Sequence, residues 1–196
     1  MSEDERFSRG IQVDPRLLCY EPFHEHGEVP RFDSGEPDLD RFLNSEEVQE
    51  YEEDKLGSTW LVYYAGDLVA YYTIGTDSLR IEYLDEKKLS GRHFKKGQHR
   101  VESIPSLKIG RLAVQREHQG RGFGRLLIRR IASIAFRSQP AVRFLTVNAK
   151  APSVPFYRKC GFELTREVRR EKNRRERTMY LDLLAIGDVM QEDGSV

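Results

Sequence analysis

A glycine-rich segment has the residue types and spacing best suited to binding an anion. Gln119-Gly120-Arg121-Gly122-Phe123-Gly124 follows an apolar stretch and precedes a segment with helical periodicity. Glycines adopt positive φ angles and let a ligand approach the backbone, while the free N–H groups that begin a helix attract negative charge. The segment therefore predicts a turn that binds a pyrophosphate through the backbone N–H groups of residues 119–124, with Arg121 or Arg125 adding charge.

Two other phosphate-binding motifs do not fit this segment. A P-loop needs Lys-Ser or Lys-Thr after its glycines, and neither pair follows here. A dinucleotide-binding GxGxxG pattern is also absent, because Gly120, Gly122 and Gly124 alternate. We therefore expect a pyrophosphate ligand that is bound by neither of these two motifs.

Strands and helices that could position this turn follow from hydrophobic periodicity. Residues 58–75 read as a hairpin with a turn at 65–67, and residues 104–114 as a strand that leads into the turn. Leu127, Ile131, Ile134 and Ala135 form one face of the following helix. The remaining predictions are helices from Pro37 and over 45–55, a loop over 85–100, a helix over 122–138, a strand over 143–149, a short helix ending at Gly161, and strands over 162–169 and 177–186.

Length and composition favour a single mixed α/β (α+β) domain. The chain has 196 residues, and we expect residues 1–15 to form a disordered tail and residues 16–190 one domain. No apolar run approaches the roughly 18 residues of a membrane span, and the acidic N-terminus does not resemble a signal peptide, so we expect a cytoplasmic protein. Cys19 and Cys160 are too few for a disulfide framework, and His24 and His26 lack further ligand spacing, so we expect no metal site.

Charge is distributed unevenly along the chain. Residues 1–60 hold 17 acidic and 6 basic residues, whereas residues 61–196 hold 15 acidic and 26 basic residues. The two parts could attract each other within one fold, or the basic part could attract an anionic ligand. Charge alone does not decide between these alternatives.

Two motifs together resemble the GNAT superfamily of N-acetyltransferases. Gln119, Gly122 and Gly124 match its acyl-CoA motif, and residues 156–162 (FYRKCGF) look like its FYxxxGF signature. The resemblance covers residues 58–184, and residues 31–57 more weakly. It implies a single domain with a GNAT-type mixed central sheet, mostly antiparallel and flanked by helices. It also implies that acetyl-CoA is the co-substrate and that its acetyl group moves directly to a primary amine in a ternary complex.

The resemblance also assigns roles to individual residues. The backbone N–H of Val114 would stabilise the oxyanion, and Tyr157 would protonate the departing thiolate. Lys150 stands where many members have an asparagine that contacts the coenzyme, so either that contact is absent or Asn148 provides it. The implied coenzyme-binding residues are Leu112, Ala113, Val114, Gln119, Gly120, Arg121, Gly122, Phe123, Gly124, Arg125, Asn148 and Tyr157.

The residue that removes the proton from the amine is left open. Glu102, His99 and His118 have suitable chemistry, and water often serves in this superfamily. Cys160 could act as a nucleophile, but no histidine lies near it in the sequence, which favours a buried apolar role. A non-catalytic regulator that binds acyl-CoA and docks a basic partner is an alternative to an enzyme.

The N-terminal half resembles the toxin subgroup of the same superfamily. FDSGEPDLDRFL and AYYTIG are similar to its FDCG segment, Leu-Asp-x-Phe-Leu helix and Gly-Tyr-Tyr strand, with Ser34 in place of cysteine. This resemblance implies acetylation of aminoacyl-tRNA and neutralisation by a ribbon-helix-helix antitoxin. RNA would have to meet residues 100–180, which hold 20 Lys and Arg and 6 Asp and Glu, because the N-terminal helices are acidic. The strand over 177–186 could also pair across a homodimer.

Overall fold

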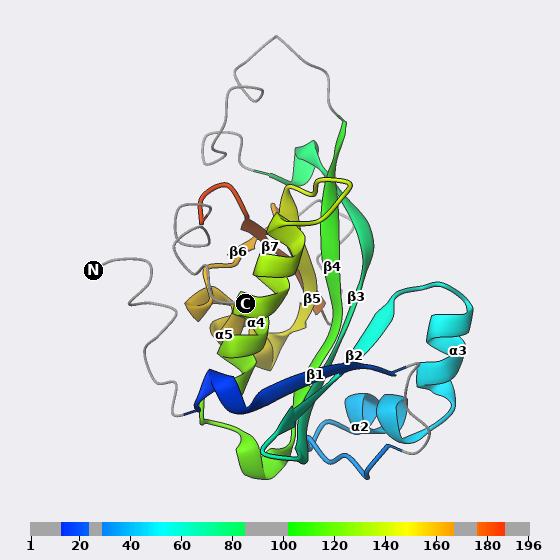
Figure 1. Ribbon diagram of the computed structural model, residues 1–196. Helices are drawn as coiled ribbons and strands as arrows, with labels where there is room; N and C mark the ends of the chain where they lie inside the picture. Colours follow the sequence, from blue (N-terminus) through cyan, green and yellow to red (C-terminus); the bar gives the residue numbers. More distant parts are fainter. Residues whose placement is uncertain (1–12, 24–28, 85–101, 167–175, 187–196) are drawn as a thin grey trace. The chain divides into compact units, whose positions relative to one another are not determined.

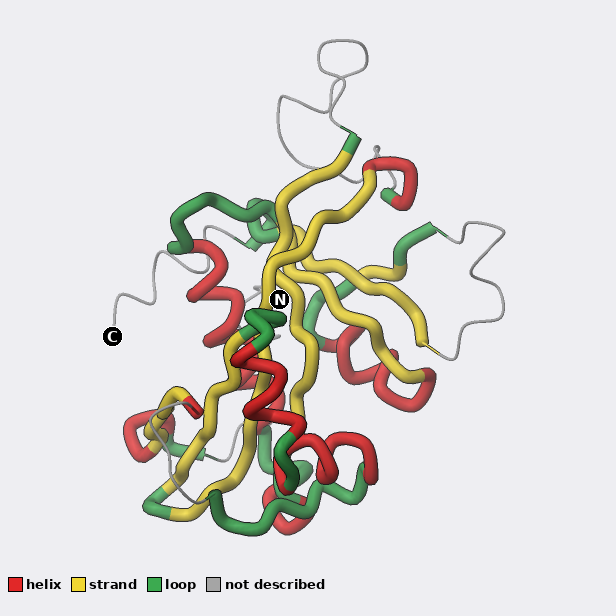
Figure 2. The backbone as a smooth tube through the Cα atoms, turned by 90° about the vertical axis from the view of Figure 1, so that its right-hand side faces the viewer, coloured by secondary structure: helices red, strands yellow, loops and turns green. Residues whose placement is uncertain are grey.

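The computed structural model describes residues 13–23, 29–84, 102–166 and 176–186, and the five segments outside these ranges are grey in Figures 1 and 2. The chain divides into two compact units. The first unit holds residues 8–75 and 109–128, and the second holds residues 1–7, 76–108 and 129–196. The glycine-rich segment belongs to the first unit and Tyr157 to the second.

The first unit is built on antiparallel strands. Strand β2 (Ser58–Tyr64) pairs on one side with β1 (Leu18–Pro22) and on the other with β3 (Asp67–Arg80). Ala65 and Gly66 connect β2 to β3 with φ angles of 52° and 96°, the left-handed conformations that a tight hairpin turn requires. The unit also contains η1 (Pro15–Leu17), α2 (Pro37–Asn44), α3 (Glu47–Glu53), η6 (Arg116–His118), the end of β4 (Ser103–Val114) and the start of α4 (Phe123–Phe136).

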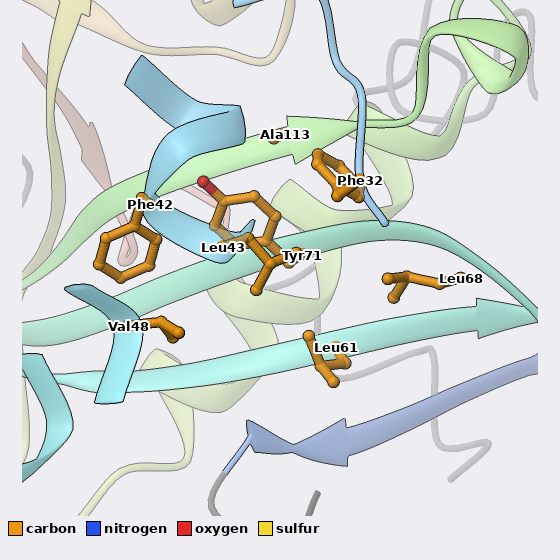
Figure 3. Packing of buried hydrophobic residues seen from close by; sticks show 8 residues of the cluster. All are labelled: Phe32, Phe42, Leu43, Val48, Leu61, Leu68, Tyr71 and Ala113. Atoms are coloured by element: carbon orange, nitrogen blue, oxygen red, sulfur yellow. The ribbon is translucent and has the colours of Figure 1, made fainter. Parts of the chain in front are cut away.

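Three aromatic residues, Phe32, Phe42 and Tyr71, pack together in the core of the first unit (Figure 3). The ring of Tyr71 on β3 lies edge-on to Phe32 and stacks with Phe42 of α2, at centroid distances of 5.1 and 6.0 Å. Its hydroxyl donates a hydrogen bond of 2.7 Å to the carbonyl of Leu39, so a buried polar group is satisfied. These contacts attach α2 to the strands. The buried members of the cluster are Phe32, Phe42, Leu43, Val48, Leu61, Leu68, Tyr71 and Ala113.

The second unit holds the other strands and the helix that carries Tyr157. Strand β7 (Glu176–Asp182) pairs antiparallel with both β5 (Phe144–Lys150) and β6 (Glu163–Leu164). The short helices η3 (Ile81–Tyr83), η7 (Ala151–Ser153) and α5 (Val154–Lys159) belong to this unit. A half-buried ion pair of 2.7 Å between Arg143 and Asp182 joins the residue before β5 to the end of β7.

The predicted fold class is confirmed. The strand order is β1-β2-β3-β4-β5-β7-β6, and the four pairs β1–β2, β2–β3, β5–β7 and β6–β7 are antiparallel. Together with α2, α3, α4 and α5 they form a mixed α/β fold whose sheet is mostly antiparallel. The boundaries of one domain over 16–190 stay a prediction; residues 1–12 lie outside the described residues, Val13 is buried and η1 begins at Pro15. No helix among the described residues has the length and apolar character to cross a membrane.

Most predicted elements are present, and the differences have local causes. Strand β1 was not predicted, because it is a short segment whose Leu18 and Tyr20 are only half-buried. Strand β7 ends four residues before the predicted boundary, since the Asp182 carboxylate accepts the N–H of Leu184 and turns the chain. Strand β6 covers only Glu163 and Leu164 of the range predicted over 162–169. Residues 162, 165 and 166 are described but are not part of a strand, whereas residues 167–169 and the predicted loop over 85–100 lie outside the described residues.

Candidate active site

The glycine-rich segment forms the predicted turn at the start of α4. Gly120 and Gly122 have φ angles of 75° and 100°, and the carbonyl of Gly122 accepts the N–H groups of Arg125 and Leu126 at 3.1 Å. Helix α4 therefore begins directly after Gly122. The N–H groups of Phe123 and Gly124, the first two residues of α4, have no acceptor within the helix, which is the arrangement that binds a pyrophosphate.

Backbone conformation, rather than crowding, requires glycine at position 120. A Cβ atom added there would have no other atom within 4 Å. A positive φ angle costs an L-residue about 1–2 kcal/mol, so any substitution would strain the turn even though space is available.

Arg121 is held beside this turn by aromatic and imidazole contacts. Its guanidinium lies 5.6 Å from the ring centroid of Phe123 and 5.9 Å from that of Tyr64, and its Nη1 lies 2.9 Å from Nδ1 of His118. Because arginine only donates hydrogen bonds, we assign His118 the neutral form with its proton on Nε2. His118 thus positions the cation that we expect to meet the pyrophosphate.

The side chain of Gln119 joins two segments of the protein to each other. Its Nε2 donates to the carbonyl of Ser34 at 2.8 Å and to the carbonyl of Val114 at 3.0 Å. Its backbone N–H donates to the carbonyl of Arg116 at 3.3 Å. Gln119 therefore connects the segment before α2 with the end of β4, where the oxyanion donor is expected.

Further hydrogen bonds attach the FDSG segment to the start of η6. The N–H of Asp33 donates to Oε1 of Gln115 at 2.6 Å, and the N–H of Arg116 donates to the carbonyl of Asp33 at 2.8 Å. The Arg116 guanidinium pairs with the Asp33 carboxylate at 3.0 Å and holds the pKa of that carboxyl below its usual value. These residues and Glu117 line an open hollow of about 340 Å³. Sequence reasoning missed their role, because side-chain bonds between segments about 80 residues apart leave no periodic signal.

Replacing Gln119 with alanine tests whether this connection supports the turn. We expect Gln119→Ala to lower the free energy of unfolding by about 1–2 kcal/mol, since two carbonyls lose their donor, and to raise the KM for acetyl-CoA. Urea denaturation and steady-state kinetics measure the two effects. Gln49→Ala is the matched control, because Gln49 bonds to Glu53 on α3 and touches none of these segments; equal results for both variants would contradict the assigned role.

The end of β4 presents the backbone that we expect to contact the coenzyme arm. Leu112 and Val114 are half-buried, and Ala113 between them is buried in the aromatic core. Successive side chains of a strand point to opposite faces, so Ala113 fixes this segment through its packing. The Val114 carbonyl, bonded to Gln119, further restricts the peptide units of the strand end.

Tyr157 is held by the local structure of the FYRKCGF sequence. Gly161 follows α5 with a φ angle of 90°, and the returning chain lets the N–H of Phe162 donate to the Tyr157 carbonyl at 3.0 Å. The Phe162 ring then lies edge-on to the Tyr157 ring at a centroid distance of 5.4 Å. Burial raises the pKa of the Tyr157 phenol above its usual value, so the hydroxyl is protonated at neutral pH and can act as an acid.

The other residues that the sequence suggested for the site differ in exposure and in hydrogen bonding. Asn148 is exposed on β5, and its Oδ1 accepts from the Thr178 hydroxyl at 3.1 Å. Cys160 is buried and forms no disulfide with a described residue, as expected of an apolar role. Glu102 is exposed. His99, His24 and His26 lie outside the described residues.

Comparison with known proteins gives one family and a shared fold. Residues 94–183 match the family model described as an acetyltransferase (GNAT) domain. A solved bacterial toxin is similar with a TM-score of 0.73 and 17% identity, over 92% of this chain and 98% of its own. The toxin AtaT complexed with acetyl-methionyl-tRNAfMet has a TM-score of 0.68 and 22% identity, over 88% of this chain and 98% of its own.

A further solved structure contains a tyrosine-to-phenylalanine mutant of AtaT bound to acetyl-CoA and to the C-terminus of the antitoxin AtaR. Its TM-score is 0.66 and its identity 20%, over 88% of this chain and 98% of its own. At these identities the solved structures share the fold with this chain. Residues 94–183 thus match the GNAT acetyltransferase domain, and the solved structures show that the chain has the same fold over most of its length.

Proposed function

We propose that the protein transfers the acetyl group of acetyl-CoA directly to a primary amine in a ternary complex. The observation that carries this proposal is the turn in which Gly120 and Gly122, both at positive φ, present the N-terminus of α4 after β4. The family match supports the reaction class. The coenzyme would be held by Leu112, Ala113, Val114, Gln119, Gly120, Arg121, Gly122, Phe123, Gly124, Arg125, Asn148 and Tyr157.

Each chemical step has a group to perform it. The amine nitrogen attacks the thioester carbonyl, and the Val114 N–H stabilises the oxyanion, a contribution of about 3–4 kcal/mol in other acyl-transfer sites. The C–S bond then breaks, and the coenzyme thiolate takes the phenolic proton of Tyr157. A phenol is less acidic than a thiol, but the amide product makes the overall reaction favourable. Water accepts the proton that leaves the amine, and solvent returns a proton to the Tyr157 phenolate before the next turnover.

An acetyl-CoA turnover screen tests the proposal. Peptides, polyamines, aminoglycosides and bulk aminoacyl-tRNA serve as acceptors, and release of the free thiol is measured with a thiol reagent. We expect thiol release that depends on at least one acceptor. Tight coenzyme binding without turnover on the whole panel would favour the non-catalytic regulator instead.

Acetylation of aminoacyl-tRNA is a second candidate for the acceptor. It is favoured by the likeness to toxins over most of the chain and by the FDSG segment, which is bonded to η6 and Gln119. An antitoxin partner would accompany this activity. Transfer of labelled acetyl to small amines or peptides, with none to bulk aminoacyl-tRNA, would reject this candidate.

A further inference from the structure

Arg111 of β4 carries a half-buried charge that no carboxylate balances within the described ranges. Its Cζ lies 3.6 Å from the ring centroid of Phe42 and 5.1 Å from that of Tyr51. Apart from these ring contacts, the guanidinium has no ion pair or hydrogen bond to a described residue. A partly desolvated cation in this state is normally paired with an anion.

Two carboxylates that act on the same cluster are bonded to other groups. Asp40 and Glu47 both act electrostatically on Tyr71, as Arg111 does. However, Asp40 accepts the N–H and the hydroxyl of Ser34 at 2.7 and 2.5 Å, and Glu47 accepts Nε of Arg41 at 2.6 Å. Both carboxylates therefore accept hydrogen bonds from other donors, and the Arg111 guanidinium can bind an external anion.

The way Arg111 is held suits recognition of a planar or tetrahedral anion. Aromatic rings contact the face of a guanidinium, whereas its N–H groups lie in its plane. A stacked arginine thus keeps its donors in a fixed orientation and can bind a carboxylate or a phosphate through two parallel hydrogen bonds. Phe42 orients the cation without using its hydrogen-bonding capacity.

A buried threonine hydroxyl lies beside Gly110, the residue before Arg111. Thr73 Oγ1 is fully buried and has no hydrogen-bond partner among the described residues. A Cβ atom on Gly110, the residue before Arg111, would lie 2.7 Å from that oxygen and 3.3 Å from the Tyr51 hydroxyl. Glycine therefore keeps the space in front of both hydroxyls clear.

We propose that Arg111 binds an anionic group, phosphate or carboxylate, of the amine acceptor. This inference rests on the proposed acetyl transfer. Arg111 precedes Val114 by three residues, and a strand rises about 3.3 Å per residue, so their Cα atoms are about 10 Å apart. The selected acceptors therefore carry their negative charge several bonds from the reacting amine.

Binding measurements with the variant Arg111→Met test this proposal without requiring turnover. Methionine keeps an unbranched stem that packs on Phe42 but removes the charge and the donors, and thermal denaturation confirms folding. The probes are the trinucleotide CCA for phosphate, a short peptide with a free C-terminal carboxylate, and the same peptide as its C-terminal amide. Arg16→Met is the matched control, because Arg16 is 89% exposed and pairs with Asp14.

We expect Arg111→Met to weaken binding of CCA or of the free peptide by about ten-fold or more, and to leave the peptide amide and acetyl-CoA unchanged. Arg16→Met should bind all probes like the wild type, and Arg111→Lys should restore part of the loss. Which anionic probe responds identifies the source of the charge. Unchanged binding of both anionic probes by Arg111→Met, or no binding of either by the wild type, would overturn the proposal; arginine-dependent binding without any acetyl transfer would reject the proposed function alone.

Discussion

Replacing Tyr157 with phenylalanine is expected to lower kcat by about 100-fold or more, because a positioned general acid contributes 10²–10⁴-fold to the rate. Phenylalanine keeps the ring that packs edge-on against Phe162 and removes only the hydroxyl. Acetyl-CoA should therefore bind to the variant nearly as well as to the wild type. Steady-state kinetics and calorimetric titration of acetyl-CoA measure the two quantities.

The pH dependence of kcat is a second test of the role of Tyr157. Burial raises the pKa of Tyr157, so the folded state holds its proton more tightly than an exposed phenol would. The acid should remain protonated up to at least about pH 9, and kcat should show no alkaline decline from this residue below that pH. Activity of Tyr157→Phe equal to that of the wild type would remove Tyr157 from the mechanism.

Replacing Gly122 with alanine is expected to weaken acetyl-CoA binding by about ten-fold or more. Gly122 has a φ angle of 100°, and alanine in a left-handed conformation is strained by about 1–2 kcal/mol. Relief of that strain would turn the N–H groups at the start of α4 away from the pyrophosphate. Calorimetric titration of acetyl-CoA gives the affinity, and urea denaturation gives the free energy of unfolding.

The variant Gly66→Ala separates backbone strain from loss of the binding site. Gly66 has a φ angle of 96° in the β2–β3 turn, and an added Cβ would meet nothing within 4 Å. The Gly66→Ala variant should lose about as much free energy of unfolding as Gly122→Ala. Unlike Gly122→Ala, it should keep the wild-type affinity for acetyl-CoA. If the two glycine variants bound acetyl-CoA equally well, the turn at 119–124 would not be the pyrophosphate site.

Much of the fold follows from periodicity that can be read in the sequence. The stripe of Leu127, Ile131, Ile134 and Ala135 predicted α4; Ile134 is half-buried and the other three side chains are buried. The β-branched and aromatic runs around Gly66 predicted β2 and β3. Strand β1 was not predicted, because its half-buried residues show no strong alternation of apolar and polar side chains. It depends on pairing with β2, a contact that its own residues do not encode.

The candidate site was predictable only where its residues are neighbours in the sequence. Gly120, Gly122 and Tyr157 lie within short motifs whose backbone requirements are local. Arg111 and Asp33 act through partners distant in the chain, Phe42 and Arg116. Such contacts depend on tertiary packing, so residue type alone gives no sign of them.

The bond from Gln119 to the carbonyl of Ser34 affects which substitutions this segment can tolerate. Gln119 recognises a main-chain oxygen, which every amino acid at position 34 would supply. The bonds that depend on the side chain are the one that the Ser34 hydroxyl donates to Asp40 and the one that it accepts from the N–H of Glu36. An exchange between serine and cysteine at position 34 therefore keeps the hydrogen bond from Gln119 to the main-chain carbonyl. The residue at this position can vary without changing how the segment is attached to the glycine-rich turn.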